Sequence, residues 1–388
     1  MKLAQRMSRL GTETAFEVLA KAQSLEARGK SIIHLEIGEP DFETPSNIAE
    51  AGRQAIFDGF TSYNPSPGYE DLRAILAEEI TKTRRVNAKE QNIIVTPGGK
   101  PVMFFAIMAL IETGDEVLYP NPGFPIYESM IEFCGGTAVA MQLHGDKDFN
   151  INIEEVREQI GPRTKLMIIN SPNNPCGSTI GDSELEALSE LAKENDLMVL
   201  SDEIYIRFLY EGVHQSISTF PDMLDRTIIL DGFSKTYAMT GWRIGYGLFP
   251  DQLVEPISRL VTNSVSCTAS FTQKAAIEAI TGPQHDSARM VNEFRKRRDI
   301  VVKGLNRIDG IECSVPQGAF YAFPNVEGTG MSSSEFADKL LEESGVAVLS
   351  GESFGRFGTG FVRISFANSV DNLSEALIRI EKFLKAGA

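Results

Sequence analysis

Short, continuous apolar runs alternate with longer stretches of helical spacing through the middle of the chain. The apolar runs that predict strands are 92–96, 116–119, 164–170, 197–201 and 227–230. Between them, 100–112 has the composition of a buried helix and 183–194 has the apolar spacing of an amphipathic one. Apolar strands separated by helices are typical of a parallel sheet with both faces covered. We therefore predict an α/β fold with a mostly parallel sheet sandwiched by helices.

The last third of the chain has a different pattern. It predicts a charged helix, three short strands and a closing helix, at 287–309, 318–323, 347–350, 360–366 and 372–385. Such a mixture indicates a smaller α+β domain. We expect a large domain over 45–285 and a small domain built from both ends of the chain, 1–44 and 286–388.

Charge excludes some partners. The 388 residues include 37 Lys and Arg against 53 Asp and Glu, a formal net charge of −16. Phosphate backbones and anionic membranes need a surplus of basic residues, so we expect neither nucleic acid nor a membrane as partner. The four cysteines and four histidines are scattered along the chain, so we expect no metal site. Isolated thiols and the lack of a targeting segment favour a cytoplasmic protein.

Polar or glycine-rich turns follow four of the predicted strands. They cover 96–100, 171–177, 202–205 and 231–235. In a doubly wound sheet, ligands bind beyond the carboxyl ends of the strands. We therefore expect the four turns to converge on one crevice.

The turn that contains Lys235 carries the most specific motif. The stretch 234–246 reads SKTYAMTGWRIGY, and it resembles the cofactor-binding lysine motif of class I/II aminotransferases. Further similarity lies at 35–42, Tyr63, Asn174-Pro175, 202–205 and 361–365, in the order of that family. The chain is thus identified as a member of this family, most similar to its prokaryotic aspartate aminotransferase-like branch. These enzymes have fold type I and use pyridoxal 5'-phosphate.

The resemblance implies roles around the pyridine ring of the cofactor. Lys235 would bond covalently to the cofactor and later move a proton on the substrate. Asp202 would pair with the pyridine nitrogen, so that the ring can accept negative charge. Tyr205 and Asn174 would hydrogen-bond the 3′ oxygen of the ring, and Phe124 would stack on the ring. The catalytic set would be Lys235, Asp202 and Tyr205.

The resemblance also implies how the cofactor phosphate is held. Gly98, Gly99 and Lys100 begin a predicted helix, where free backbone N–H groups favour an anion. Arg243 would be the charged anchor of the phosphate. Tyr63 would reach the phosphate of the neighbouring subunit, which implies a homodimer with shared active sites.

Substrate binding follows the same resemblance. Arg363 would grip the α-carboxylate through a bidentate fork, assisted by Gly38 and Asn174. Taken singly, each of these residues has an ordinary structural explanation, but their joint appearance in family order favours function.

Two regions depart from the family. Gly232 stands where many relatives carry a phosphate-binding serine, and Ser234 is the nearby hydroxyl. Glu13 and Ala15 stand where aspartate-specific relatives carry hydroxyl side chains near the distal carboxylate of the substrate. An anionic Glu13 would repel a dicarboxylate, whereas Lys100 would attract it.

These observations predict an aminotransferase that passes an amino group from an L-amino acid to a 2-oxo acid by a ping-pong route. Aspartate with 2-oxoglutarate is the leading substrate pair on resemblance, and neutral, aromatic or cationic donors are alternatives. A C–S lyase on the same fold would use the same lysine and arginine but release ammonia and pyruvate. A third alternative is a non-enzymatic regulator that binds pyridoxal phosphate. The absence of a DNA-binding arm and the net charge of −16 argue against it.

Overall fold

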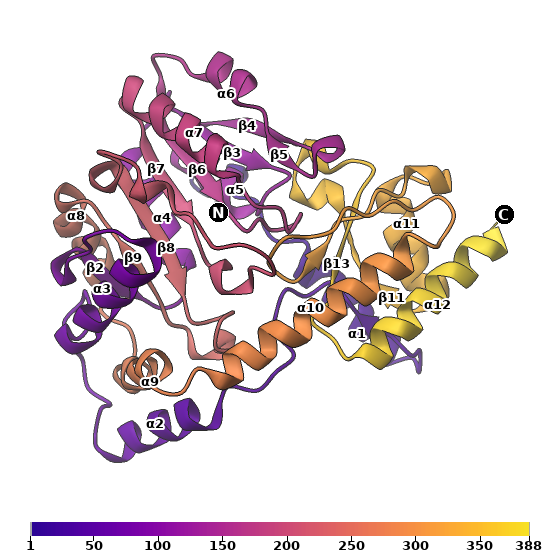
Figure 1. The fold of residues 1–388 in the computed structure, drawn as a ribbon, viewed down its shortest axis with the longest axis horizontal. Coiled ribbons are helices and arrows are strands. Elements are labelled where there is room, and N and C mark those ends of the chain that lie inside the picture. Colours follow the sequence, from indigo (N-terminus) through magenta and orange to yellow (C-terminus); the bar gives the residue numbers. More distant parts are fainter. Residues whose placement is uncertain (1, 388) are drawn as a thin grey trace.

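An eight-stranded sheet forms the centre of the molecule. The structure is a computed structural model and describes residues 2–387. The strand order is β2-β9-β8-β7-β6-β3-β4-β5 (Figure 1). The strands are β2 (Ile93–Thr96), β3 (Glu116–Asn121), β4 (Thr137–His144), β5 (Asn150–Ile151), β6 (Thr164–Asn170), β7 (Met198–Asp202), β8 (Thr227–Gly232) and β9 (Gly245–Leu248). Strands β4, β3, β6, β7 and β8 pair in parallel, so the predicted mostly parallel sheet is confirmed.

Strand β9 was not predicted from the apolar pattern. It lies between β8 and β2 and pairs antiparallel with both. Two of its four residues are glycines, which weaken the strand signal in the sequence. Its position beside β8 nevertheless places residues 240–245 next to the turn that carries Lys235.

Twelve α-helices surround the sheet and the C-terminal part within the described residues. They are α1 (Ala15–Glu26), α2 (Ser46–Phe57), α3 (Glu70–Arg84), α4 (Lys100–Leu110), α5 (Ile126–Cys134), α6 (Ile153–Gln159), α7 (Asp182–Glu194), α8 (Asp251–Ser264), α9 (Ser270–Thr281), α10 (His285–Leu305), α11 (Ser333–Lys339) and α12 (Val370–Gly387). In residues 2–387, none of them is both long and apolar enough to cross a membrane.

Helices bury both faces of the large sheet. Ile168, Leu200 and Ile228 pack on one face with α4, α5 and α8. Their sequence neighbours Met167 and Val199 point to the other face, where α7 covers them. Side chains of successive strand residues point to opposite faces, so a strand covered on both sides needs apolar residues at every position. This double coverage explains the continuous apolar runs.

Two smaller sheets lie in the C-terminal part, to the right in Figure 1. One joins β1 (Ile33–His34) to β11 (Val346–Ala347), and the other has the order β10-β13-β12, with β10 (Tyr321–Ala322), β13 (Val362–Ser365) and β12 (Leu349–Ser350). The long helix α10 and the C-terminal helix α12 pack on each other and share one core with these sheets. All strands of the large sheet fall within 93–248. The boundaries of the two domains, 45–285 against 1–44 and 286–388, stay a prediction.

The predicted strand at 318–323 is wrong in extent, because only Tyr321 and Ala322 belong to β10. The residues before it bond elsewhere. Gly318 bridges to Leu209, and the amide of Tyr210 donates to the carbonyl of Gln317. The segment therefore connects the smaller sheets with the residues that follow β7, where the predicted catalytic turn lies.

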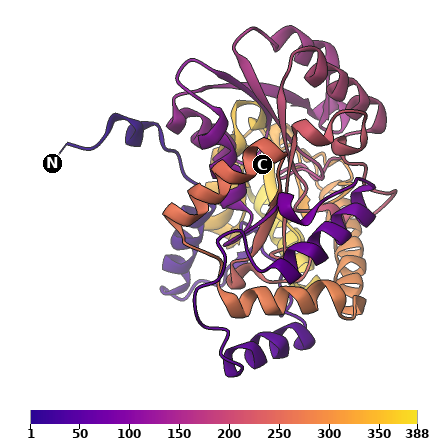
Figure 2. The same ribbon diagram turned by 90° about the vertical axis from the view of Figure 1, so that its left-hand side faces the viewer.

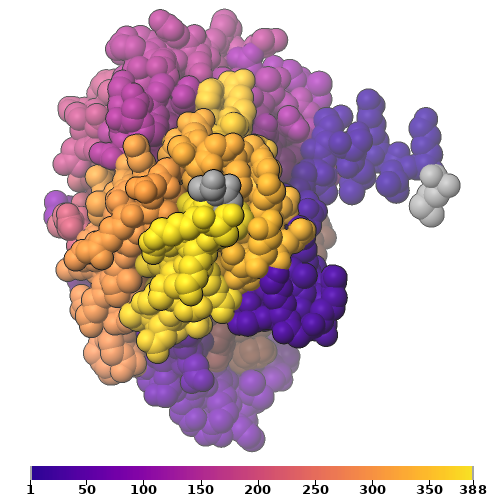
Figure 3. Space-filling view, turned by 90° about the vertical axis from the view of Figure 1, so that its right-hand side faces the viewer, coloured from indigo at the N-terminus to yellow at the C-terminus, as the bar shows by residue number. Residues whose placement is uncertain are grey.

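The N-terminal segment extends from the body as an arm (Figures 2 and 3). Its short 3-10 helix, Gln5–Arg9, contains no buried residue. Arg9 Nε donates to the carbonyl of Glu132 on α5 at 2.7 Å, which fixes the base of the arm. Figure 3 shows the arm standing apart from the face that α12 covers.

Candidate active site

The four predicted turns converge on a single cavity of about 460 Å³. It lies at the carboxyl ends of β6, β7 and β8, between the large sheet and the smaller ones. Ten of the predicted site residues line it: Gly38, Gly99, Lys100, Phe124, Asn174, Asp202, Tyr205, Lys235, Arg243 and Arg363. Gly98 lies just behind Arg243, and Tyr63 lies outside the cavity.

Lys235 follows β8 and extends into the cavity. Its Nζ donates a hydrogen bond to the carbonyl of Gly38 at 2.5 Å and lies 5.9 Å from the centre of the Phe320 ring. Desolvation lowers the pKa of Lys235 to about 8, with nearby Arg363 acting in the same direction. A lysine with this pKa is partly unprotonated near neutral pH and can act as a nucleophile or a base.

Asp202 ends β7 and is buried. One carboxylate oxygen accepts the Tyr127 hydroxyl at 2.6 Å, and the other accepts the amide of Ile204 at 3.2 Å. Burial raises the pKa of Asp202 to about 6, although both hydrogen bonds oppose the rise. Within residues 2–387 it forms no ion pair, so the carboxylate lacks an opposite charge.

Arg363 on β13 is a buried cation, whereas Asp202 is a buried acid. Its guanidinium donates to the side-chain oxygen of Asn174 at 3.0 Å and to the carbonyl of Glu36. Its guanidinium carbon lies over two aromatic rings, 4.6 Å from the centre of Tyr321 and 4.9 Å from that of Phe354. Its Nε has no hydrogen-bond partner among the residues described. A buried guanidinium without a carboxylate is costly, which makes Arg363 suited to an anionic ligand.

Arg243 and the turn before α4 form a second polar corner. Gly98 has a φ of 90°, and a Cβ built on it would lie 2.2 Å from a guanidinium nitrogen of Arg243. A side chain at position 98 would thus push the guanidinium away. Gly99 precedes α4, so the free amides of this helix start beside Arg243. The corner combines backbone donors with a cation, as a phosphate requires.

Gly232 and Ser234 differ in their relation to this corner. Ser234 lines the cavity, whereas Gly232 is packed against β9 and does not. A Cβ at Gly232 would lie 3.1 Å from the Cα of Gly245. The hydroxyl that the site has in this turn is therefore that of Ser234.

Glu13 and Lys100 meet at the outer part of the cavity. Their side chains form an ion pair, with exposed fractions of 18% and 46%. Lys100 Nζ also lies 5.4 Å from the centre of the Phe124 ring. Thr14, Ala15 and Phe16 complete this wall, so the N-terminal segment lines the cavity as its sequence suggested.

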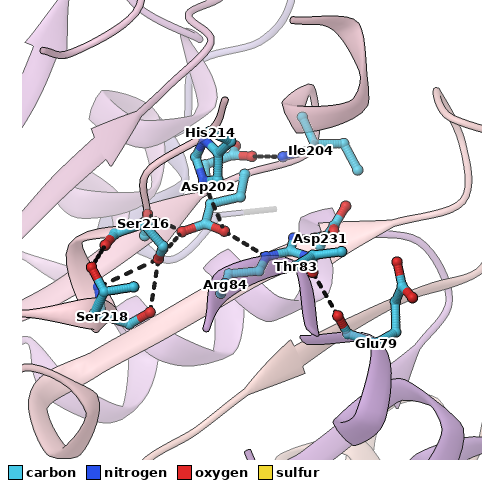
Figure 4. A network of polar contacts seen from close by, with 12 residues as sticks. Glu79, Thr83, Arg84, Asp202, Ile204, His214, Ser216, Ser218 and Asp231 are labelled. Carbon is cyan, nitrogen blue, oxygen red and sulfur yellow. Dashed lines mark hydrogen bonds and ion pairs between the residues drawn. The ribbon is translucent and has the colours of Figure 1, made fainter. Parts of the chain in front are cut away.

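A buried network of ion pairs stabilises the ends of β7 and β8. Arg84, the last residue of α3, is buried and pairs with Glu203 at 2.9 Å and with Asp231. Figure 4 shows Arg84 directed at the strand ends, with His214 and Ser216 nearby. Burial acts to raise the pKa of Glu203, but His214 and Arg84 hold it well below its ordinary range. The network anchors the residues next to Asp202 and Gly232.

Sequence reasoning missed Tyr127, Tyr321 and Arg84. Tyr127 lies in the first turn of α5, and its ring contacts that of Phe124, just before the helix, at a centroid distance of 5.7 Å. Tyr321 has apolar neighbours on both sides, and Arg84 lies in a charged segment, so neither carries a local functional signal. Only the tertiary structure brings these three to the site.

The chain was compared with known proteins. The family model of aminotransferase class I and II matches residues 30–380. An aspartate aminotransferase of Pyrococcus abyssi is 38% identical, over 95% of each chain, and aromatic-amino-acid aminotransferase 2 of Thermococcus litoralis is 37% identical, over 99% of each.

A solved structure is similar throughout. Aspartate aminotransferase from Thermus thermophilus with maleate matches with a TM-score of 0.94 and 36% identity, covering 99% of this chain and 100% of that one. Its fold, like that of the other structure neighbours, is fold type I of pyridoxal-phosphate enzymes. The chain belongs to the class I and II aminotransferases and is a pyridoxal-phosphate-dependent amino acid aminotransferase.

Proposed function

We propose that this cavity binds pyridoxal phosphate through Lys235 and passes an amino group from an L-amino acid to a 2-oxo acid in two half-reactions. One observation carries the proposal. A lysine amine of lowered pKa shares the cavity with a buried carboxylate that lacks a cation, Asp202, and a buried guanidinium that lacks a carboxylate, Arg363. When bound, pyridoxal phosphate supplies an electron sink for the charge that develops at the substrate Cα.

The residues around the cavity fit the ring of the cofactor. The carboxylate of Asp202 would hold a proton on the pyridine nitrogen and gain its missing opposite charge. Tyr205 and Asn174 would donate to the 3′ oxygen, and the Phe124 ring would stack on the pyridine. The hydrogen bond from Tyr127 supports this proposal, because it fixes the orientation of the Asp202 carboxylate.

The corner at Arg243 fits the phosphate. The backbone amides of Gly98, Gly99 and Lys100 and the Arg243 guanidinium would bind its oxygens. Ser234 would supply the hydroxyl that Gly232 lacks. Tyr63 of the partner subunit would complete the corner.

Arg363 would bind the substrate α-carboxylate, with Asn174 and the amide of Gly38 beside it. Lys235 Nζ, freed from the cofactor by the incoming amine, would accept the proton from the substrate Cα and return it to the product. This sequence of steps needs Lys235 unprotonated, which its lowered pKa favours.

The outer part of the cavity bears on the amino donor. Aspartate with 2-oxoglutarate is the pair that we propose first, because relatives named aspartate aminotransferases match the whole chain. The ion pair between Glu13 and Lys100 favours a second candidate, a donor with an uncharged side chain. An acidic donor would have to displace Glu13 from Lys100, whereas an uncharged one would leave the pair intact. A cationic donor could use Glu13 itself.

We propose a homodimer with shared active sites. Tyr63 is 87% exposed, and other large apolar side chains on the arm and α2 are exposed as well, namely Leu3, Met7, Leu10, Ile56 and Phe57. A second copy that covers them would bury this surface and bring its Tyr63 to the phosphate corner. We further propose a cytoplasmic location, for which the unpaired cysteines are the support.

Reduction with borohydride tests the role of Lys235. Treatment of the cofactor-loaded protein, followed by peptide mapping, should place a pyridoxyl group on the peptide that contains Lys235. The Lys100→Ala variant is the matched control, since it removes the other lysine of the cavity and should give the same adduct. A pyridoxyl group on Lys100, or none on Lys235, contradicts the proposal.

A further inference from the structure

Tyr321 contacts groups on both sides of the proposed site. It lies on β10, lines the cavity and is 1% exposed. Its hydroxyl is 2.8 Å from that of Tyr205, and its ring lies 4.6 Å from the guanidinium carbon of Arg363. The same side chain therefore touches the residue proposed for the ring oxygen of the cofactor and the residue proposed for the substrate carboxylate.

The backbone at Gly38 fixes the position of the Tyr321 hydroxyl. A Cβ built on Gly38 would lie 2.2 Å from this hydroxyl, so the close packing depends on glycine. The carbonyl of Gly38 accepts the hydrogen bond from Lys235 Nζ. Tyr321, Gly38 and Lys235 are thus in one chain of contacts, and a displaced Tyr321 would disturb the surroundings of the amine.

We propose that Tyr321 is a positioning residue with two functions. Its hydroxyl directs the Tyr205 hydroxyl toward the ring oxygen of the cofactor, and its ring holds the Arg363 guanidinium in place for the substrate α-carboxylate. The inference rests on the proposed function of the cavity.

The first function follows from the hydrogen-bonding capacity of two hydroxyls. A single proton occupies the Tyr205–Tyr321 bond, so one hydroxyl donates and the other accepts. When Tyr321 donates, the Tyr205 proton is free for an anionic oxygen in the cavity. A hydroxyl that accepts one hydrogen bond becomes a stronger donor in the next, because the two bonds polarise each other.

The charges near the pair favour neutral hydroxyls that can donate. Burial raises the pKa of both tyrosines, and Arg363 opposes this rise without reversing it. Glu13 acts on Tyr321 and Asp202 on Tyr205, both in the raising direction. The hydrogen bond between the two hydroxyls raises the pKa of Tyr205 and lowers that of Tyr321. Both hydroxyls therefore keep their protons over the neutral range.

Replacing the hydroxyl alone tests the first function. A donor to the ring oxygen stabilises the negative charge there and makes the bound cofactor less basic. In Tyr321→Phe, the weaker donation from Tyr205 should raise the pH midpoint of the cofactor absorbance change by about 0.2–0.6 pH unit. An unchanged or lowered midpoint overturns the proposal.

Two further variants separate this effect from a general loosening of the core. Tyr210 is a buried tyrosine whose hydroxyl donates to the carbonyl of Ala319, and it does not line the cavity. Tyr210→Phe should leave the midpoint unchanged. In the background of Tyr205→Phe, the added Tyr321→Phe change should also leave it unchanged, because the effect acts through Tyr205. A shift in either comparison overturns the positioning role.

The second function is tested by the affinity for a 2-methyl amino acid, which has an α-carboxylate but no Cα proton. Tyr321→Phe keeps the ring and should keep the affinity of the wild type. Tyr321→Leu removes the ring and should weaken binding by about 2- to 30-fold, the range of a cation–π contact. Equal affinity in Leu and Phe variants contradicts this function.

Borohydride reduction of the wild-type protein tests the proposed function of the cavity independently of Tyr321. A pyridoxyl group on Lys235 after borohydride reduction, together with an unshifted Tyr321→Phe midpoint, refutes the role of Tyr321 alone. Absence of that adduct in the wild type refutes the proposed function of the cavity.

Discussion

Asp202 and Arg363 are both buried and charged, and within residues 2–387 neither forms an ion pair with a group of opposite charge. An unpaired buried charge destabilises a fold, so such residues persist where a ligand supplies the missing charge. Here the two line one cavity, and Lys235 lines the same cavity. The arrangement links the stability of the cofactor-free protein to the ability of the site to bind.

Asp202→Asn should stabilise the cofactor-free protein at neutral pH. Burial gives Asp202 a folded pKa of about 6, against about 3.9 in an unfolded chain. The folded state therefore binds more protons between pH 4 and 6, and the stability contribution of this group is lost as pH rises through that window. Above pH 6 the variant should be more stable by about 3 kcal/mol, and the difference should vanish near pH 4.

Urea denaturation of both cofactor-free proteins from pH 4 to pH 8 measures this difference. With cofactor, the same variant should lose about 10²–10³-fold in turnover, because a neutral amide cannot hold the proton on the ring nitrogen. A variant that is less stable than the wild type at pH 7.5 would show that Asp202 already has a partner.

Glu13→Ala should favour acidic donors. Removal of Glu13 leaves Lys100 free for a distal carboxylate, so kcat/KM for aspartate should rise up to about 5-fold, the value of a half-exposed ion pair. Alanine and phenylalanine should change little. Arg363→Lys is the matched control, since loss of the bidentate fork should weaken all amino acids alike. A selective loss of arginine as donor in Glu13→Ala would instead reveal a cationic pocket.

At the scale of elements, the apolar pattern predicted β3, β6, β7 and β8 of the parallel strands and the site turns with them, but it missed the parallel strand β4. Residues 166–169 of β6 are apolar at every position because helices cover both faces of the sheet. Strand β9 was not predicted, because its glycines have a low propensity for strands. Lys235 was predictable from a local motif, but Tyr321 and Arg84 were not, since their partners are more than 100 residues away.

Arg84→Leu should show how strongly α3 is tied to the strand ends. The change leaves the buried carboxylates of Glu203 and Asp231 without their cation, and it should cost about 3–5 kcal/mol of unfolding free energy. Arg53→Ala, which breaks an exposed pair with Glu50 on α2, should leave stability unchanged. Urea denaturation of both variants measures this, and equal midpoints would contradict the anchoring role of Arg84.

At the scale of the whole molecule, the proposed homodimer with shared active sites predicts that two defective subunits can complement each other. Tyr63→Ala should weaken phosphate binding in the partner subunit, and Lys235→Ala should abolish turnover in its own. A mixed dimer has one site with both an intact Lys235 and the partner subunit's intact Tyr63. Unfolding and refolding the two variants together should therefore give more activity than either alone. Activity no higher than that of the two separately refolded variants would contradict a shared site.

The transfer of nitrogen is the central claim, and isotope labelling tests it most directly. The cofactor-loaded protein is incubated with ¹⁵N-labelled aspartate, or with the best donor found, and with unlabelled 2-oxoglutarate. The ¹⁵N should appear in glutamate in equal amount to the donor consumed, and Lys235→Ala should abolish the transfer. Release of the ¹⁵N as free ammonia, or transfer that persists in Lys235→Ala, would contradict the account.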